Sequence, residues 1–214
     1  MATADRLNAI YDRLLAHWGP QHWWPAETPF EVMVGAILTQ NTAWKNVERA
    51  LVNLKGAGLL SLASLADLPT ALLAEYIRPA GYYNLKAGRL HNLLRCITDQ
   101  FGDDLQAFLA QPLPRLREQL LAVKGVGPET ADSILLYAAG LPIFVVDTYT
   151  HRILTRHQVI DEDFGYEAIQ ELFMDNLPCE AQLYNEYHAL LVRVGNLYCK
   201  KKNPVCAACP LQGV

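Results

Sequence analysis

Apolar side chains repeat at helical spacing along nearly all of the 214 residues of the chain. In segment 4–17, Leu7, Ile10 and Leu14 share one stripe, which predicts an amphipathic helix. Segment 30–38 is apolar on most sides, which predicts a helix that is buried all round. The other periodic segments span 44–54, 61–68, 69–77, 85–101, 105–110, 116–123, 129–139, 148–157, 166–174 and 181–194. Because no alternating strand pair and no internal repeat is visible, we predict an all-α fold of about ten or more short helices.

Hydrophobic residues make up 51% of the chain, which is enough for a real core and excludes low-complexity disorder. No apolar run approaches the roughly 20 residues that a membrane-spanning helix needs. Segment 1–20 has no basic region followed by an apolar run, so it does not resemble a signal peptide. We therefore expect a cytoplasmic protein without a membrane partner, and a monomer.

The net charge of −4 argues at first against binding to nucleic acid, but the charges are unevenly distributed. Segment 157–186 holds eight acidic residues and no Lys or Arg, so the rest of the chain carries +4. Basic residues gather near the C-terminal end at Arg193, Lys200, Lys201 and Lys202. A local basic face of this kind can bind phosphates although the total charge is acidic.

A glycine turn, Gly125-Val126-Gly127, separates two predicted helices, and Pro128 opens the second one. Glycines at this spacing let the backbone approach another molecule closely. Amide groups of the turn and of the next helix could then bind a phosphate. An ordinary helical hairpin without a ligand explains the same residues equally well.

Asp147 follows three apolar residues and opens the predicted helix at 148–157. An Asp at this position is typical of a helix N-cap. The alternative is an ionised carboxylate that faces a groove.

Three of the five cysteines, Cys199, Cys206 and Cys209, lie within eleven residues near the C-terminal end. Thiolates at this density bind a soft metal ion, with zinc as one possibility, or an iron–sulfur cluster. The isolated Cys96 and Cys179 are typical of small buried hydrophobic residues. An odd number of cysteines in a cytosolic chain does not favour a disulfide framework.

In this order and spacing, the glycine hairpin, the later Asp and the C-terminal cysteines resemble the endonuclease III family of helix-hairpin-helix DNA glycosylases. The resemblance covers essentially the whole chain. It implies two helical lobes, with a six-helix lobe at 28–131 and a second lobe formed by 1–27 and 132–214. A DNA-binding cleft is expected between them, and a [4Fe–4S] loop is expected at the C-terminal end. The cysteine spacing of the family puts the fourth ligand at position 215, one residue beyond the given sequence, which suggests a trimmed sequence.

The family resemblance assigns roles to individual residues. Asp147 matches the catalytic Asp of the family, and Gln40 matches the residue that fills the gap left by an extruded nucleotide. Tyr82 stands where the family has a Leu that wedges into the duplex, and an aromatic ring could stack there. Contacts to the DNA backbone are expected from two groups of residues, namely Gly125, Val126 and Gly127 in the hairpin and Lys200, Lys201 and Lys202 in the cysteine loop.

One departure from the family pattern bears on the mechanism. Bifunctional members carry a Lys in the hairpin sequence Gly-Val-Gly-x-Lys-Thr-Ala, where it attacks the sugar and forms a Schiff base. This chain has Glu129 at that position, and a carboxylate cannot form an imine. The sequence therefore predicts a monofunctional glycosylase that hydrolyses the base–sugar bond. Glu129 itself is interpreted as a solvated helix residue, with electrostatic tuning of the pocket as the alternative.

A narrower resemblance links segments 23–25, 35–42, 78–84 and 131–135 to the 3-methyladenine DNA glycosylase III branch. In that branch, aromatic residues at the positions of Trp24 and Trp44 line the base pocket. Electron-rich indole faces attract the positive charge of an alkylated purine. A simple core role is the alternative for both tryptophans. At least some members of the branch have lost the cluster, whereas this chain keeps most of its ligands.

The predicted substrate is duplex DNA with a damaged base, which the enzyme flips into a pocket. Asp147 would then stabilise the oxocarbenium-like sugar and orient or deprotonate a water molecule. Two other functions stay open. The first is a bifunctional glycosylase and lyase for oxidised pyrimidines that uses another amine such as Lys124. The second is a non-catalytic DNA-binding module.

Overall fold

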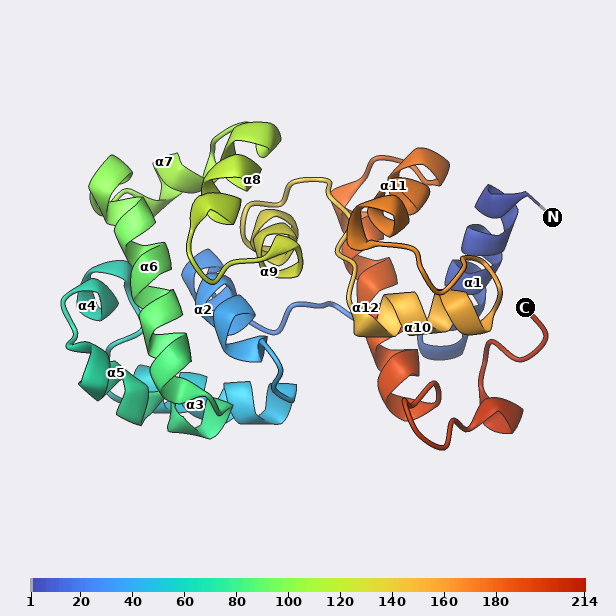
Figure 1. Cartoon of the computed structure of the whole chain (residues 1–214), viewed down its shortest axis with the longest axis horizontal. Coiled ribbons are helices and arrows are strands. Elements are labelled where there is room, and N and C mark those ends of the chain that lie inside the picture. Colours follow the sequence, from blue (N-terminus) through green and yellow to red (C-terminus); the bar gives the residue numbers. More distant parts are fainter. Residues whose placement is uncertain (1) are drawn as a thin grey trace. The chain divides into compact units, whose positions relative to one another are not determined.

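The computed structural model describes residues 2–214, and helices form nearly all of its regular structure (Figure 1). No strand occurs among these residues, which confirms the predicted all-α class. In the same part of the chain, no helix is both long and apolar enough to cross a membrane. The chain divides into two compact units, a continuous unit of residues 26–141 and a split unit of residues 2–25 and 142–214.

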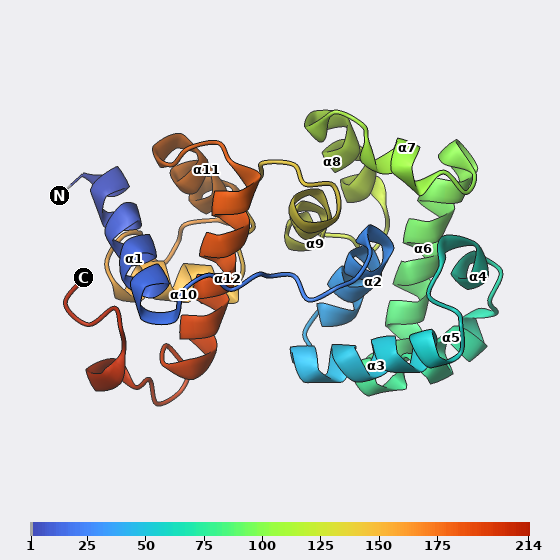
Figure 2. The ribbon, with the colours of Figure 1, turned by 180° about the vertical axis from the view of Figure 1, so that it is seen from behind.

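The continuous unit contains most of the helices (Figure 2). Its elements are α2 (Pro29–Thr39), α3 (Trp44–Gly56), α4 (Leu62–Ala66), α5 (Thr70–Tyr76), η1 (Arg78–Ala80), α6 (Tyr83–Phe101), α7 (Leu105–Leu109), α8 (Leu113–Ala122), α9 (Pro128–Ser133) and η2 (Ile134–Ala138). Every residue of α2 from Phe30 to Leu38 is buried, as its apolar sequence predicts. Thr28 caps this helix, since its hydroxyl accepts a hydrogen bond from the Glu31 amide at 3.1 Å.

The sequence predicts a boundary between the lobes at 131/132, whereas the contacts of the structure place it at 141/142. The reason is the η2 segment, which continues α9 as a π-helical turn and packs against α2. Residues 134–138 therefore belong to the same core as the buried helix.

The split unit joins both ends of the described chain. It contains α1 (Thr3–Trp18), α10 (Thr148–Arg156), α11 (Tyr166–Asn176), α12 (Ala181–Leu197) and η3 (Cys206–Ala208). Within this unit, α12 packs against α10 and α1 (Figure 2). Phe144 and Phe173 stack with ring centroids 3.7 Å apart, and the hydroxyl of Tyr187 donates to the Leu7 carbonyl at 2.8 Å. These contacts form the core under α10.

Gly195 allows α10 and α12 to approach each other closely. A Cβ at Gly195 would lie only 2.4 Å from Cδ1 of Tyr149, whereas a Cβ at Gly88 in α6 would meet nothing within 4 Å. Tyr149 stands two residues after Asp147, so this close approach positions the start of α10.

We expect Gly195→Ala to destabilise the protein by about 1–3 kcal/mol, because the added methyl group overpacks the contact with Tyr149. The control Gly88→Ala should instead stabilise the protein by about 0.5–1 kcal/mol, because it only removes the entropy cost of a helical glycine. Denaturant unfolding measures both changes. Stabilisation by Gly195→Ala would contradict the close packing described here.

Candidate active site

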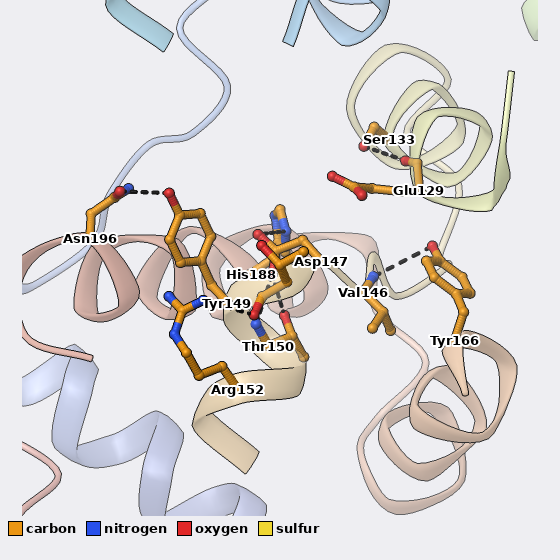
Figure 3. Close-up of polar contacts among 11 residues, drawn as sticks. Glu129, Ser133, Val146, Asp147, Tyr149, Thr150, Arg152, Tyr166, His188 and Asn196 are labelled. Carbon is orange, nitrogen blue, oxygen red and sulfur yellow. Dashed lines mark hydrogen bonds and ion pairs between the residues drawn. The ribbon is translucent and has the colours of Figure 1, made fainter. Parts of the chain in front are cut away.

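Asp147 lies at the N-terminal end of α10, and its carboxylate is almost completely buried (Figure 3). Its Oδ1 accepts two hydrogen bonds from Thr150, one from the amide at 2.7 Å and one from the hydroxyl at 2.9 Å. Its Oδ2 lies 3.6 Å from Nε2 of His188, which comes from α12. The exposed fractions of the two side chains are 10% and 8%. The predicted N-cap is thus present, and the same carboxylate also faces an imidazole.

This environment determines the charge of Asp147. Burial alone raises the pKa of the carboxyl, because it disfavours the charged form. The imidazole of His188 close to Oδ2, together with the two hydrogen bonds from Thr150, outweighs burial and leaves the pKa of Asp147 below its ordinary value of 3.8. The carboxylate is therefore ionised at neutral pH and held in one orientation.

A second set of contacts fixes the first turn of α10. The Tyr149 hydroxyl donates to Oδ1 of Asn196 at 2.7 Å, and the guanidinium of Arg152 lies 5.0 Å from the centre of the Tyr149 ring. In Figure 3 the Tyr149 ring stands between Asn196 and the Asp147 carboxylate, and its hydroxyl points toward Asn196. Burial and the nearby charge of Asp147 raise the pKa of Tyr149, so its hydroxyl keeps its proton and remains a donor.

The glycine hairpin lies in the continuous unit and joins α8 to α9. Gly125 has a positive φ of 97°, which a side chain would strain, and a Cβ there would lie 2.5 Å from Cγ of Arg89. Gly127 is exposed and forms the N-cap of α9. Val126 is buried, and its amide donates to the Val123 carbonyl at 3.0 Å, so Val126 serves packing within the turn.

Gln40 contacts the hairpin directly. Its Nε2 donates to the Gly125 carbonyl and to the Thr130 hydroxyl, each at 3.0 Å, and its Oε1 accepts a hydrogen bond from Nη1 of Arg89. Both ends of the Gln40 amide are therefore engaged within the continuous unit. Tyr82 differs, because its side chain is 70% exposed and its backbone adopts a positive φ of 46°.

Glu129 is exposed in the first turn of α9, and its backbone carbonyl accepts a hydrogen bond from the Ser133 hydroxyl at 2.7 Å (Figure 3). The interpretation of Glu129 as a solvated helix residue, with electrostatic tuning of the pocket as the alternative, stays a prediction. Lys124, on the other side of the turn, is also exposed.

Both candidate pocket tryptophans are half-buried, and their role as pocket walls or core residues stays a prediction. Trp24 belongs to the split unit, and its ring lies 5.5 Å from that of Trp23. Trp44 opens α3 in the continuous unit, and its Nε1 donates to Oε1 of Glu48 at 2.8 Å.

The cysteine loop follows α12 and is held by two arginines of α10. Nε of Arg152 donates to the Cys199 carbonyl at 2.7 Å, and Nη1 of Arg156 donates to the Lys200 carbonyl at 2.8 Å and contacts Sγ of Cys199 at 3.3 Å. Lys200, Lys201 and Lys202 are exposed. The loop therefore presents its lysine side chains to solvent while α10 holds its backbone.

The three thiols of this loop influence one another, but they do not form a closed metal site. Burial raises the pKa of Cys209, and the neighbouring Cys199 and Cys206 raise it further. Within residues 2–214, no three His, Cys, Asp or Glu side chains converge on a point that could hold a metal ion. Three thiols in one loop are donors that suit an iron–sulfur cluster. Elsewhere, Cys179 is exposed, so its prediction as a buried residue is wrong; its position in the loop between α11 and α12 explains the exposure.

Sequence reasoning missed two residues of these sites. His188 stands in the apolar segment 187–191, where a single imidazole on a buried helix face is a signal of a polar partner. Arg89 lies 49 positions from Gln40 and gives no local signal.

The chain is similar in sequence and in fold to known DNA repair proteins. The model of the HhH-GPD superfamily of base excision DNA repair proteins matches residues 34–179. The protein MJ1434 of Methanocaldococcus jannaschii, which its name assigns provisionally to the DNA repair glycosylases, is 50% identical over 209 residues, covering 97% of this chain and 94% of its own length.

Two solved structures show the same fold. The H. pylori 3-methyladenine DNA glycosylase MagIII, bound to 1,N6-ethenoadenine, has a TM-score of 0.76 and 32% identity, covering 90% of this chain and 96% of its own. A non-covalent endonuclease III–DNA complex has a TM-score of 0.83 and 22% identity, covering 98% of this chain and 94% of its own.

The low pKa of Asp147 predicts an acid-sensitive contribution to stability. Because the pKa is lower in the folded state, this contribution is complete above the ordinary value of 3.8 and is lost as the pH falls through the folded value. Asp147→Asn should therefore lose less unfolding free energy than the wild type when the pH is lowered through this window. Asp163→Asn is the control, because it removes a carboxyl that is exposed to solvent. Equal acid sensitivity of Asp147→Asn and wild type would contradict the assignment.

Proposed function

Because this chain belongs to the HhH-GPD superfamily of base excision DNA repair proteins, it is a DNA glycosylase, and we propose that it acts monofunctionally on alkylated purines in duplex DNA. The reaction would hydrolyse the N-glycosidic bond and leave an abasic site. One observation carries this proposal: Asp147 is a buried carboxylate that two donors of Thr150 and the imidazole of His188 keep ionised.

An ionised carboxylate is suited to the chemistry of this bond. When the C1′–N bond breaks, its electron pair neutralises the positive charge of an alkylated purine, and positive charge develops on the sugar. Asp147 would stabilise that charge and accept a hydrogen bond from the attacking water. The water oxygen bonds to C1′, and its proton passes to Asp147 and then to solvent. His188 would act as a positioning residue, because it contacts Oδ2 and not the sugar.

The residue at position 129 supports hydrolysis rather than a covalent route. A lyase needs an amine that forms a Schiff base with C1′, and the carboxylate of Glu129 cannot supply one. Glu129 is also exposed, as a solvated helix residue would be. A bifunctional enzyme for oxidised pyrimidines, like endonuclease III, remains the second candidate function, and it would need another amine such as Lys124.

Two features support an alkylated purine as the substrate. The MagIII structure, which is 32% identical to this chain, contains an ethenoadenine, a modified adenine base. Trp24 and Trp44 are both accessible, and Glu48 holds the Trp44 indole in place through a hydrogen bond. Indole faces attract a cationic ring, and a positively charged purine leaves with little acid catalysis.

DNA contacts would come from both units. Exposed Lys200, Lys201 and Lys202 would bind phosphates from the cysteine loop. In the hairpin, Gly125 and Gly127 would let the backbone approach a phosphate, while Val126 would support the turn through its packing.

A strand assay on end-labelled duplexes tests this function. With an alkylated purine in the duplex, we expect strand breaks only after treatment with alkali, because a monofunctional enzyme leaves an intact abasic strand. Asp147→Asn should reduce base release by about 10²–10³-fold while the variant stays folded. Full base release by Asp147→Asn would overturn its role.

The same strand assay distinguishes the monofunctional glycosylase from the second candidate, a bifunctional glycosylase and lyase. Breaks at thymine glycol without alkali, or covalent trapping with borohydride, would show a lyase and contradict the role given to Glu129. Glu129→Lys is the matched gain-of-function variant, since it restores the amine of the bifunctional pattern and should introduce trapping that the wild type lacks. Duplex binding without release of any base would favour a non-catalytic module.

We also propose that Cys199, Cys206 and Cys209 are ligands of a [4Fe–4S] cluster. When bound, the cluster would order the loop that carries the three lysines. The protein should purify brown, with bound iron and sulfide, and Cys206→Ser should remove the colour. A colourless protein with one zinc ion would overturn this assignment.

A further inference from the structure

Lys86 in α6 is a buried cation, with only 1% of its surface exposed. Its ammonium group donates three hydrogen bonds, to the Leu38 carbonyl at 2.7 Å, the Thr42 hydroxyl at 2.8 Å and the Ala80 carbonyl at 2.8 Å. The Thr42 hydroxyl in turn donates to the Ala80 carbonyl at 2.5 Å. All three N–H donors of the ammonium group are therefore used, and every acceptor belongs to a loop or a helix end.

These acceptors bracket the two residues expected to enter the DNA duplex. Leu38 and Thr42 lie two positions before and two positions after Gln40, and Ala80 lies two positions before Tyr82. The Lys86 amide also donates to the Tyr82 carbonyl at 2.9 Å. One side chain thus links the loop of Gln40 to the loop of Tyr82 within the continuous unit.

Both loops have backbones that need such a restraint. Asn41, Gly81 and Tyr82 adopt positive φ angles of 52°, 66° and 46°, and for the two non-glycine residues this conformation is unfavourable. Thr42 also lies close to Gly81, because a Cβ at Gly81 would be 3.9 Å from the Thr42 hydroxyl. The ammonium group therefore holds two unfavourable turns side by side.

On the basis of the function proposed above, we propose that Lys86 is a positioning residue that fixes the loops of Gln40 and Tyr82 to each other, so that the two side chains enter the duplex as one unit. Burial and the charge of Arg89 lower the pKa of Lys86 to about 8, so at neutral pH the side chain is still protonated and keeps its three donors. Lys86 itself does not contact DNA in this role, because its side chain is buried.

The test compares Lys86→Met with Lys55→Met. Lys55 lies in the same unit and pairs with Glu27 at 3.1 Å and with the buried carboxylate of Glu31 at 2.9 Å, at the opposite end of α2 from Gln40. Its variant therefore also removes one positive charge and the contacts of that charge. Binding is measured on a duplex that carries a tetrahydrofuran abasic analogue opposite 2-aminopurine, whose fluorescence responds to changes in stacking. Circular dichroism at the same temperature shows that each variant is folded.

We expect Lys86→Met to weaken binding at least about tenfold and to abolish the fluorescence change, whereas Lys55→Met keeps both close to wild type. Tyr82→Ala should give the same loss as Lys86→Met. The double variant should be no weaker than either single variant, because Lys86 acts through the loops. The role of Lys86 would be overturned if the two losses of binding affinity multiplied in the double variant. Equal effects of Lys86→Met and Lys55→Met would also overturn it.

Failure of this inference is distinguishable from failure of the proposed function. Base release from the alkylated duplex is read separately on the wild type, so its absence would refute the glycosylase assignment without the binding data. The wild type could show the fluorescence change, Tyr82→Ala could remove it, and Lys86→Met could keep it. This combination of results would refute only the role of Lys86. A wild type without any fluorescence change would refute insertion, and the role of Lys86 with it.

Discussion

A charged carboxylate removed from water is the constraint on which the split unit depends. An ion in a protein interior is costly unless hydrogen bonds and an opposite charge compensate for the lost water. For Asp147, the start of α10 supplies both donors of Thr150, and α12 supplies His188. The packing of α12 against α1 holds that helix in place through the hydrogen bond from Tyr187 to Leu7. The core therefore sets the charge and the direction of the candidate catalytic group.

The continuous unit contains a buried ion of the opposite charge, and hydrogen bonds stabilise it as well. Its buried ion is the ammonium group of Lys86, and the partners are two carbonyls and one hydroxyl at ends of helices and turns. Carbonyls at the end of a helix lack partners within the helix, so a buried cation there satisfies acceptors that would otherwise need water. The same contact that stabilises the fold thus also determines where the loops of Gln40 and Tyr82 lie.

Local sequence patterns predicted the helices well, because the period of apolar residues reports which face is buried. The buried α2 and the N-cap at Asp147 follow from neighbouring residues, and both are found. The partners of Lys86 and Gln40 could not be predicted from neighbouring residues, because Leu38 lies 48 positions from Lys86 and Gly125 lies 85 positions from Gln40. A Lys in an amphipathic helix ordinarily indicates a solvated face. Only the tertiary structure reveals that this one is buried.

The hydrogen bonds of Gln40 add an energetic argument about selectivity. For Gln40 to fill a gap in DNA, its amide must leave Arg89, the Gly125 carbonyl and the Thr130 hydroxyl. In an intact base pair the Watson–Crick edges are paired with each other, so these edges cannot replace the lost hydrogen bonds and the exchange is unfavourable there. A nucleotide that has left the stack exposes the edge of the opposite base, which can replace the lost partners. Because the hairpin is one of the partners that Gln40 must release, the phosphate binding proposed for the hairpin and the gap filling expected of Gln40 would be physically linked.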